Sequence, residues 1–494
     1  MTTLNVKWGK EKLSVEANTD EPPLLLKSQL FAMTGVTPER QKIVIKGRTL
    51  GDDSWNGITL TQGMLIMMMG SADAIPQAPA PSADGAEAEK GTAKAAALPP
   101  GLKNLGNTCY MNSVIQSLKT IPVLRDSLSS FDVPSGQVQP AQRITSAMKS
   151  VFKDLSRTSN GPDDAGLPIM MLQTLHSVLP QFSTRSPQGQ LMQQDANECF
   201  TEVQRFLLDG LKSSAPNATL PSEYFRGRYA VSLKNKESEE EAEQKTTEDF
   251  FQLSCFLSAE VKYIQTGIRE KMTEEIEKMS PVLGREAKYE RKALVDRLPA
   301  YLSIQMVRFF FKQQATVNAK ILKDIKFPLT LDLFDICTPE LQTKLIENRD
   351  AFKAMEDAKL ERMRAAKLEG SDGKAAEESI EKEENALPFS FPDDEGSNNS
   401  GFYDLQAVIT HKGRSSDSGH YVAWVRLKGD QWAMCDDDEV HAVNSEQILK
   451  LSGGGDWHCA YVLVYGPRRA YKIDPLETAA PPVSNDVAEP MATD

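Results

Sequence analysis

The chain has 494 residues, of which 40% are hydrophobic and 25% charged, and its formal net charge at neutral pH is −13. This length predicts two or three domains, and the composition is that of a globular protein. The negative charge argues against nucleic acid or an anionic membrane as the main partner. Six cysteines without a Cys-x-x-Cys pair exclude a disulfide scaffold and disfavour a zinc finger. Without a membrane-length apolar run or a secretory signal, we expect a cytoplasmic and nuclear location.

Residues 1–70 predict a small α+β unit. Alternating apolar residues from Leu4 to Trp8 and a second segment around Val15 indicate a hairpin. Helical spacing follows over 24–33, and short apolar segments lie at 43–45 and 58–69. This order of elements resembles ubiquitin. The unit lacks a terminal Gly-Gly, so we expect that it is not itself conjugated. Its own fold and flexible tether favour a docking domain over a solubility or folding module.

The rest of the chain divides by composition. Residues 71–98 are rich in alanine and proline and predict a flexible linker, and 469–494 predict a disordered tail. Residues 99–468 form the large domain. Within it we expect two solvated insertions, at 234–249 and at about 349–399. In the second, 351–368 has good helix formers, whereas 370–384 is too polar to pack.

A glycine-containing turn precedes one cysteine at the start of a predicted helix. Residues 101–112 read GLKNLGNTCYMN, and helical spacing runs from Tyr110 to Leu118. At a helix N-terminus, the Cys109 thiol would face free backbone N–H groups and the positive end of the helix dipole, which favour the nucleophilic thiolate. The pattern by itself favours a buried structural cysteine about equally.

A second motif pairs a histidine with a carboxylate. A Gly/Ser loop leads into a strand that opens with His420, and the segment WAMCDDD, which contains Asp436, follows after a short turn. This spacing suits a hairpin that places the carboxylate beside the imidazole. Such a carboxylate fixes the histidine tautomer and stabilises the imidazolium. Taken singly, a histidine at a strand start or an aspartate triplet is more often structural.

The motifs, in the order Cys, His, Asp, resemble the signature boxes of the ubiquitin-specific proteases, a papain-like family of cysteine peptidases. Residues 193–198 (QQDANE) resemble a further box of that family, and 460–465 resemble its closing strand. The resemblance covers about 99–468. It implies an α+β chain: a β-grasp ubiquitin-like domain, then a papain-like catalytic domain with an inserted β-rich, zinc-free subdomain that grips ubiquitin.

The resemblance also implies a role for each motif residue. Cys109 would be the nucleophile, His420 the general base and acid, and Asp436 the residue that orients His420. Asn104 would stabilise the oxyanion with the Cys109 N–H, and Asp437 is a further helper. No metal or cofactor is implied.

Substrate contacts and gating loops follow from the same resemblance. Asp195 and Glu198, spaced i,i+3 and expected on one helix face, would meet the arginines of the ubiquitin tail, with Gln193 and Tyr421 beside them. A negatively charged large domain suits this basic tail. Two loops would cover the tail cleft in the free enzyme, and the charge of Asp417 would favour the open loop. The gating residues are Phe311, Ser415, Ser416, Asp417 and Ser418.

The implied function is proteasome-associated deubiquitination, with hydrolysis after the C-terminal glycine of ubiquitin. Expected partners are ubiquitin, ubiquitinated proteins and the 26S proteasome regulatory particle, the last through residues 1–70. We expect a monomer that binds neither nucleic acid nor a membrane. Two alternatives stay open: a largely non-catalytic ubiquitin-binding regulator of the proteasome, and a protease for another ubiquitin-like modifier.

Overall fold

The computed structural model divides the chain into two compact units, Met1–Lys94 and Ala95–Asp494. The predicted linker and tail lie mainly outside the described residues, as 71–96 and 473–494. The structure describes residues 2–8, 11–17, 19, 23, 26–27, 30, 41–45, 48–51, 55, 58, 60–69, 97–133, 137–159, 161–213, 220–312, 317–368, 385–415, 418–455 and 457–472.

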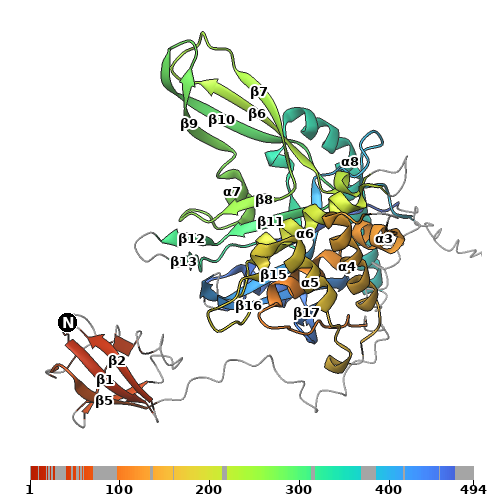
Figure 1. Ribbon diagram of the computed structural model, residues 1–494. Helices are drawn as coiled ribbons and strands as arrows, with labels where there is room; N and C mark the ends of the chain where they lie inside the picture. The colour runs from red at the N-terminus through yellow and green to blue at the C-terminus, as the bar shows by residue number, and fades with distance from the viewer. Residues whose placement is uncertain are drawn as a thin grey trace, which may run out of the picture. The chain divides into compact units, whose positions relative to one another are not determined.

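The first unit is built on one five-stranded sheet of order β2-β1-β5-β3-β4 (Figure 1). The central pair, β1 and β5, is parallel, and β1 and β2 form the predicted antiparallel hairpin. Of the predicted helix, Leu26, Lys27 and Leu30 are described, and all three are helical and buried. This arrangement confirms the ubiquitin-like fold. The strands are β1 Thr2–Trp8, β2 Glu11–Ala17, β3 Lys42–Ile45, β4 Arg48–Thr49 and β5 Met64–Met69.

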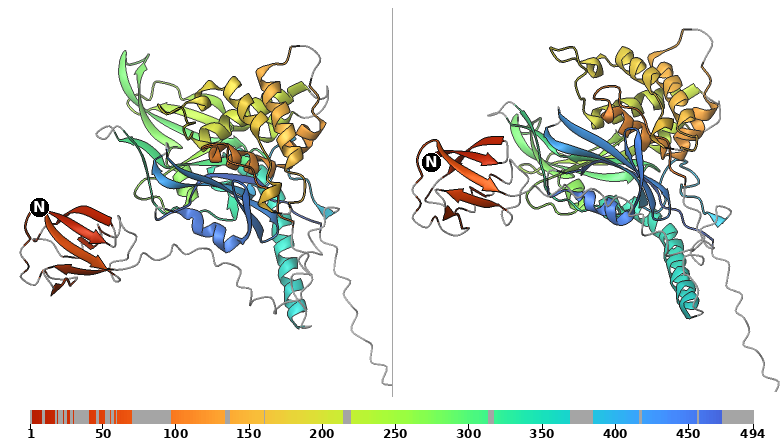
Figure 2. Two further views of the ribbon diagram at one scale, coloured as in Figure 1. Left: turned by 60° about the horizontal axis from the view of Figure 1, so that its bottom comes forward. Right: turned by 90° about the horizontal axis from the view of Figure 1, so that it is seen from below.

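The second unit packs a group of helices against one face of an eight-stranded mixed sheet (Figure 2). The sheet order is β18-β17-β16-β15-β19-β11-β8, with β14 paired to β15. One hydrophobic core joins residues of α2, α4 and α6 to residues of β15, β16 and β19. The strands are β8 Leu253–Phe256, β11 Leu302–Val307, β14 Thr330–Asp332, β15 Phe402–Ser415, β16 Ser418–Lys428, β17 Gln431–Asp436, β18 Glu439–Asn444 and β19 Cys459–Pro467.

Helix α2 (Cys109–Lys119) is the central helix of this layer, and every residue from its start to Leu118 is buried. Among the described helices, none is both long and apolar enough to cross a membrane. The other α-helices are α3 Pro122–Ser130, α4 Pro140–Asp154, α5 Ile169–Val178, α6 Ala196–Gly210, α7 Ile264–Arg269, α8 Pro339–Leu368 and α10 Ser445–Leu449. The short 3₁₀ helices are η2 Pro162–Asp164, η3 Pro180–Ser183, η4 Leu211–Ser213, η5 Pro221–Tyr224, η6 Phe334–Ile336 and η8 Lys450–Ser452.

A separate four-stranded antiparallel sheet of order β7-β6-β10-β9 projects from the body of this unit (Figure 1). It confirms the expected β-rich insertion, with strands β6 Gly227–Asn235, β7 Gln244–Phe250, β9 Thr273–Ser280 and β10 Arg285–Arg297. The stretch 234–249 is mostly exposed, as expected, but it is an ordered part of this sheet and not a separate insertion. It forms the end of β6, most of β7 and the connection between them. Glu241 accepts hydrogen bonds from Tyr289 (2.8 Å), Asn235 (2.8 Å) and Ser280 (2.6 Å).

The predicted insertion at 349–399 is only partly solvated. Its first part continues α8, and 369–384 lie outside the described residues. The remaining part, 385–399, packs into the unit. Asp394 pairs with buried Arg297 at 2.7 Å, and the Asn398 N–H donates to the Leu298 carbonyl at 2.9 Å. Polar residues in this stretch satisfy one another inside the fold, which their composition alone did not indicate.

Candidate active site

The turn before α2 is held by one asparagine side chain. Asn104 Oδ1 accepts the backbone N–H groups of Gly106 (2.9 Å) and Thr108 (3.2 Å), and Thr108 Oγ1 accepts that of Leu105 (2.9 Å). This compact loop delivers Cys109 as the first residue of the helix, as the sequence predicted. Its side chain lies at the edge of the core, where the residue is 3% exposed.

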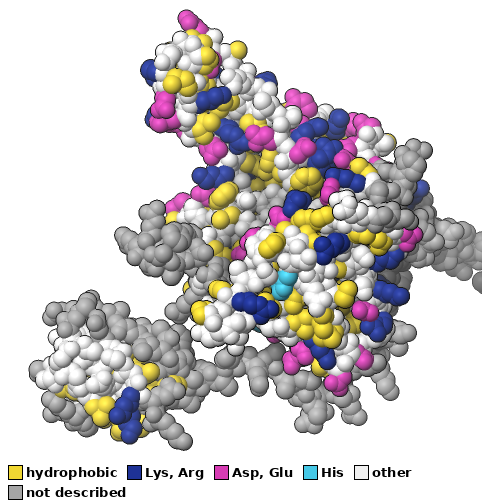
Figure 3. All heavy atoms as spheres, in the orientation of Figure 1, with side chains coloured by type: hydrophobic (Ala, Val, Ile, Leu, Met, Phe, Trp, Pro, Cys, Tyr) yellow, Lys and Arg dark blue, Asp and Glu magenta, His cyan; other side chains and the backbone are white. Residues whose placement is uncertain are grey.

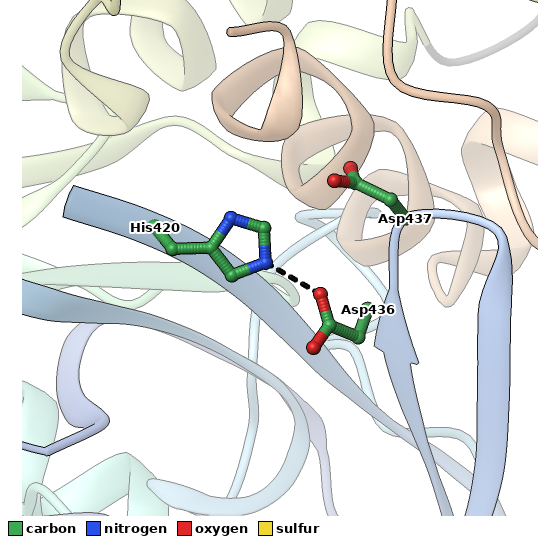
Figure 4. A group of neighbouring side chains, drawn as sticks. All are labelled: His420, Asp436 and Asp437. Atoms are coloured by element: carbon green, nitrogen blue, oxygen red, sulfur yellow. Dashed lines mark hydrogen bonds and ion pairs between the residues drawn. The ribbon is translucent and has the colours of Figure 1, made fainter.

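The hairpin of β16 and β17 brings His420 and Asp436 together. His420 Nε2 lies 2.5 Å from Asp436 Oδ1 (Figure 4). The two strands pair in antiparallel register, with Ala423 opposite Cys435. Because Nε2 of His420 is hydrogen-bonded to the Asp436 carboxylate, Nδ1 is the ring nitrogen that is available to hydrogen-bond with the Cys109 thiol.

The electrostatics join Cys109 to this pair. Hydrogen bonds with Asp436 and then with the Cys109 side chain raise the pKa of His420 to about 10. Burial acts to raise the pKa of Asp436, but the hydrogen bond and charge of His420 outweigh it and hold that pKa below its ordinary value. The three side chains thus form one interacting group in which the imidazolium is stabilised between two partners.

Asp437 lies beside this group in the turn after β17, where it adopts a φ of 54°. Its Oδ2 accepts a hydrogen bond from Asn104 Nδ2 (2.8 Å), and its Oδ1 accepts one from Asn112 Nδ2 (2.9 Å). Burial raises the pKa of Asp437. His420, Asp436 and Asp437 also offer three ligand atoms within 4.8 Å of one another (Figure 4). The amide donors and His420 account for this geometry without a cation.

Asp195 differs from the expectation that it shares a helix face with Glu198. It is the N-cap of α6, and its Oδ1 accepts the backbone N–H groups of Asn197 (2.7 Å) and Glu198 (3.0 Å). Its Oδ2 accepts the hydroxyl of Tyr461 (2.7 Å). The physical reason is that an aspartate before a helix satisfies the first unpaired N–H groups. Of these two carboxylates, Glu198 belongs to the helix itself and is exposed.

Comparisons with known proteins identify the family of this chain. The family described as ubiquitin carboxyl-terminal hydrolase matches residues 100–465. The chain belongs to this family. It is 42% identical to Ubiquitin carboxyl-terminal hydrolase 14 of Caenorhabditis elegans, over 99% of both chains. It is 40% identical to Ubiquitin carboxyl-terminal hydrolase 6 of Arabidopsis thaliana, over 95% of this chain and 99% of the plant protein.

A solved structure shares the fold at low identity. A chain of the SAGA Ubp8/Sgf11/Sus1/Sgf73 DUB module bound to ubiquitin aldehyde superposes with a TM-score of 0.52 at 19% identity. The match covers 75% of this chain and 70% of the other. Family membership makes this hydrolase an enzyme of the ubiquitin thiol protease class.

The other predicted substrate residues of the hydrolase lie close to Asp195. Tyr421 follows His420 on β16 and is fully buried, with its ring 6.2 Å from that of Tyr461. Gln193 is 9% exposed, and its Nε2 has no hydrogen-bond partner among the described residues. A buried amide donor of this kind can serve an acceptor that arrives with the substrate.

The predicted gating residues are only partly described. Ser415 and Ser418 face each other across the end of the β15–β16 hairpin, while Ser416 and Asp417 lie outside the described residues. The backbone of Phe311 pairs with that of Asn318 in the ribbon formed by β12 (Phe309–Lys312) and β13 (Val317–Lys320). The gating role of these loops stays a prediction.

The sequence interpretation missed two supporting residues. Asn112 lies one helical turn after Cys109 and links α2 to Asp437, and Tyr461 links β19 to Asp195. The available signal for the first was an amide side chain three residues after Cys109, on the same side of the predicted helix. Of the remaining histidines, His458 lies with its ring 6.5 Å from that of His420, and burial lowers the pKa of His458 to about 4.

Proposed function

We propose that this hydrolase is a proteasome-associated deubiquitinase that cleaves the isopeptide bond after the C-terminal glycine of ubiquitin. The observation that carries the proposal is the group formed by Cys109, His420 and Asp436 beside the Asn104 turn. A thiol, a histidine and an orienting carboxylate are the parts that acyl transfer by a cysteine requires.

In the proposed reaction, the Cys109 sulfur attacks the glycine carbonyl carbon while His420 holds the thiol proton. The oxyanion is stabilised by the Cys109 N–H at the start of α2 and by an N–H of Asn104. His420 then gives its proton to the lysine amine, the C–N bond breaks, and a thioester remains. Water hydrolyses the thioester with His420 as the base, which restores the thiol and releases ubiquitin.

The arginines of the ubiquitin tail would be held by Glu198. Burial and the neighbouring Asp195 raise the pKa of Glu198, so an arriving guanidinium would relieve an unfavourable carboxylate environment. Asp195 would act through the helix end and Tyr461, because both of its oxygens already accept hydrogen bonds.

Docking on the proteasome would use the first unit. On the outer face of its sheet, β5 exposes three large apolar side chains: Leu65 (58%), Met67 (49%) and Met69 (47%). Lys7 and Lys42 lie directly opposite Met67 and Met69 on the neighbouring strands. An apolar strip of this size flanked by cations is typical of a protein-binding surface.

The test is covalent labelling of the full chain by ubiquitin carrying a C-terminal electrophile, with and without added proteasome, and with Cys109→Ala as the control. Labelling of Cys109 supports the enzyme. Labelling that requires proteasome also supports loop gating, whereas equal labelling without it removes the gating role. A chain that binds ubiquitin and is never labelled would be the non-catalytic regulator instead.

A further inference from the structure

We propose that residues 161–170 and the turn after β17 form a binding surface for the second ubiquitin of a chain, the one whose lysine is released. The proposal rests on the proposed function and names the leaving-group side of the same site.

The two flanks of the Cys109 turn are distinct. On one flank, Asn107 Nδ2 donates to the Leu191 carbonyl (2.8 Å) and so joins the turn to the segment that leads to Asp195. On the other flank, the Leu102 N–H donates to the Asp437 carbonyl (2.7 Å) and the Lys103 N–H to the Gly166 carbonyl (2.9 Å). A carbonyl held at Cys109 with its tail towards Asp195 directs its amine towards this second flank.

Three large apolar side chains are exposed beside that second flank. Leu167 is 54% exposed, Ile169 40% and Met170 65%, all within four residues at the start of α5. Figure 3 shows apolar side chains gathered on the face of the molecule that carries α5. Single exposed apolar residues are ordinary, but a contiguous group next to an active site indicates a contact surface.

A hollow of about 290 Å³ adjoins the same segment. Its mainly apolar wall is completed by the polar side chains of Ser159 and Asp438. The lining residues are Leu98, Pro99, Ser159, Gly161, Pro162, Asp438 and Val440. Gly101 packs tightly against Asp438, because a Cβ atom on Gly101 would lie 2.5 Å from the Asp438 carbonyl oxygen. The hollow lies between residues 161–162, which precede the apolar group in the sequence, and Asp438 in the turn that carries Asp437.

The surface is acidic as well as apolar. Asp163, Asp164, Asp438 and Glu439 are all exposed around it. A β-grasp protein offers the matching chemistry, as the first unit of this chain illustrates with Met67 and Met69 opposite Lys7 and Lys42. A second ubiquitin, which has this fold and brings the modified lysine, is therefore the occupant that fits both position and charge.

The test compares two substrates of the full-length enzyme: ubiquitin with a small C-terminal fluorophore, and an isopeptide-linked ubiquitin dimer. Met170→Glu should lower kcat/KM for the dimer about tenfold, as expected for a buried interface residue, and leave the fluorophore substrate within about twofold. Ile169→Gln is the milder second variant. Leu449→Glu, at an apolar residue of α10 that is 40% exposed, is the matched control and should change neither substrate.

The outcomes distinguish a binding surface for the second ubiquitin from a defect in catalysis or folding and from self-association of this chain. An unchanged rate on the dimer for both variants overturns the inference and leaves the deubiquitinase intact. An equal loss on both substrates also overturns it, because the defect would then lie in catalysis or folding. If the wild type cleaves neither substrate even with added proteasome, the proposed function itself fails. Oligomers of the wild type that Met170→Glu dissociates would assign the surface to a second copy of this chain instead.

Discussion

The carboxylate of Asp437 offers the sharpest test of how this active site is held. It accepts hydrogen bonds from the side-chain amides of Asn104, in the turn before α2, and Asn112, in α2 itself. The change is Asp437→Ala. The expected result is a lower kcat with little change in KM, because the Asn104 amide would lose its orientation towards the oxyanion.

The magnitude follows from what remains after the change. Removal of an oxyanion donor, as in Asn104→Ala, lowers kcat by about 10²–10³. After Asp437→Ala, Asn104 Oδ1 still accepts two backbone N–H groups. We therefore expect a smaller loss of about tenfold, equivalent to ~1.4 kcal/mol. Asn112 Nδ2 keeps the Leu102 carbonyl as an acceptor at 3.2 Å, so the free energy of unfolding should fall by only about 1–3 kcal/mol.

The assay is steady-state hydrolysis of ubiquitin with a C-terminal fluorophore by both single variants and the double variant, alongside urea unfolding. If Asp437 acts through Asn104, the double variant should be no slower than Asn104→Ala alone. Asp437→Asn, which keeps the shape, should lie between the wild type and Asp437→Ala. Fully multiplicative rates, or a change confined to KM, would refute the reasoning.

Substitution of Asp436, Arg308 or Gly419 tests three other contacts of the second unit. The pKa of His420 is raised from 6.5 to about 10, so the stability that its pair with Asp436 contributes is complete below about pH 6.5 and is lost as the pH rises through about 10. NMR titration should show a lower His420 pKa in Asp436→Asn, and an unchanged pKa would contradict this. Buried Arg308 donates hydrogen bonds to four backbone carbonyls at 2.6–3.0 Å. Arg308→Met should therefore lower the free energy of unfolding, measured in urea, by about 3–5 kcal/mol. A loss below about 1 kcal/mol would contradict this role of Arg308. Gly419 has a φ of +132°, and in Gly419→Ala the new Cβ atom would lie 2.2 Å from the Lys412 carbonyl oxygen. The clash would displace His420, so kcat should fall roughly 10²-fold. In the control Gly429→Ala, the Cβ atom meets nothing within 4 Å, and activity should be retained.

Local patterns predicted much of this fold. The order of elements in the first unit, the position of Cys109 at a helix start and the hairpin spacing of His420 and Asp436 all depend on short stretches of chain. Glycine turns, apolar alternation and helical spacing report such stretches directly. The β-rich insertion and the triad roles came instead from the family resemblance, since no local pattern specifies them.

The parts that were missed depend on distant contacts or on competition for one side chain. Asn104 and Asp437 are separated by 333 positions in the sequence and meet only in the folded chain. The sequence pattern of Asp195 fits a position on a helix face as well as it fits an N-cap. In the structure its carboxylate accepts hydrogen bonds from the unpaired backbone N–H groups at the start of α6. The stretch 385–399 reads as polar, and it becomes buried because Arg297 and backbone groups satisfy it. Composition cannot report such partners.

The position of β19 in the sheet has a consequence for biosynthesis. This last strand lies between β15 and β11, so the sheet that carries His420 and Asp436 is complete only when Pro467 has been translated. The first unit is complete at Met69, about 400 residues earlier, an interval of roughly 20–80 s at ordinary ribosome speeds. A nascent chain therefore presents its ubiquitin-like unit long before it has a protease. Chains released before Cys459 would keep that unit and lack the strand at the centre of the enzyme.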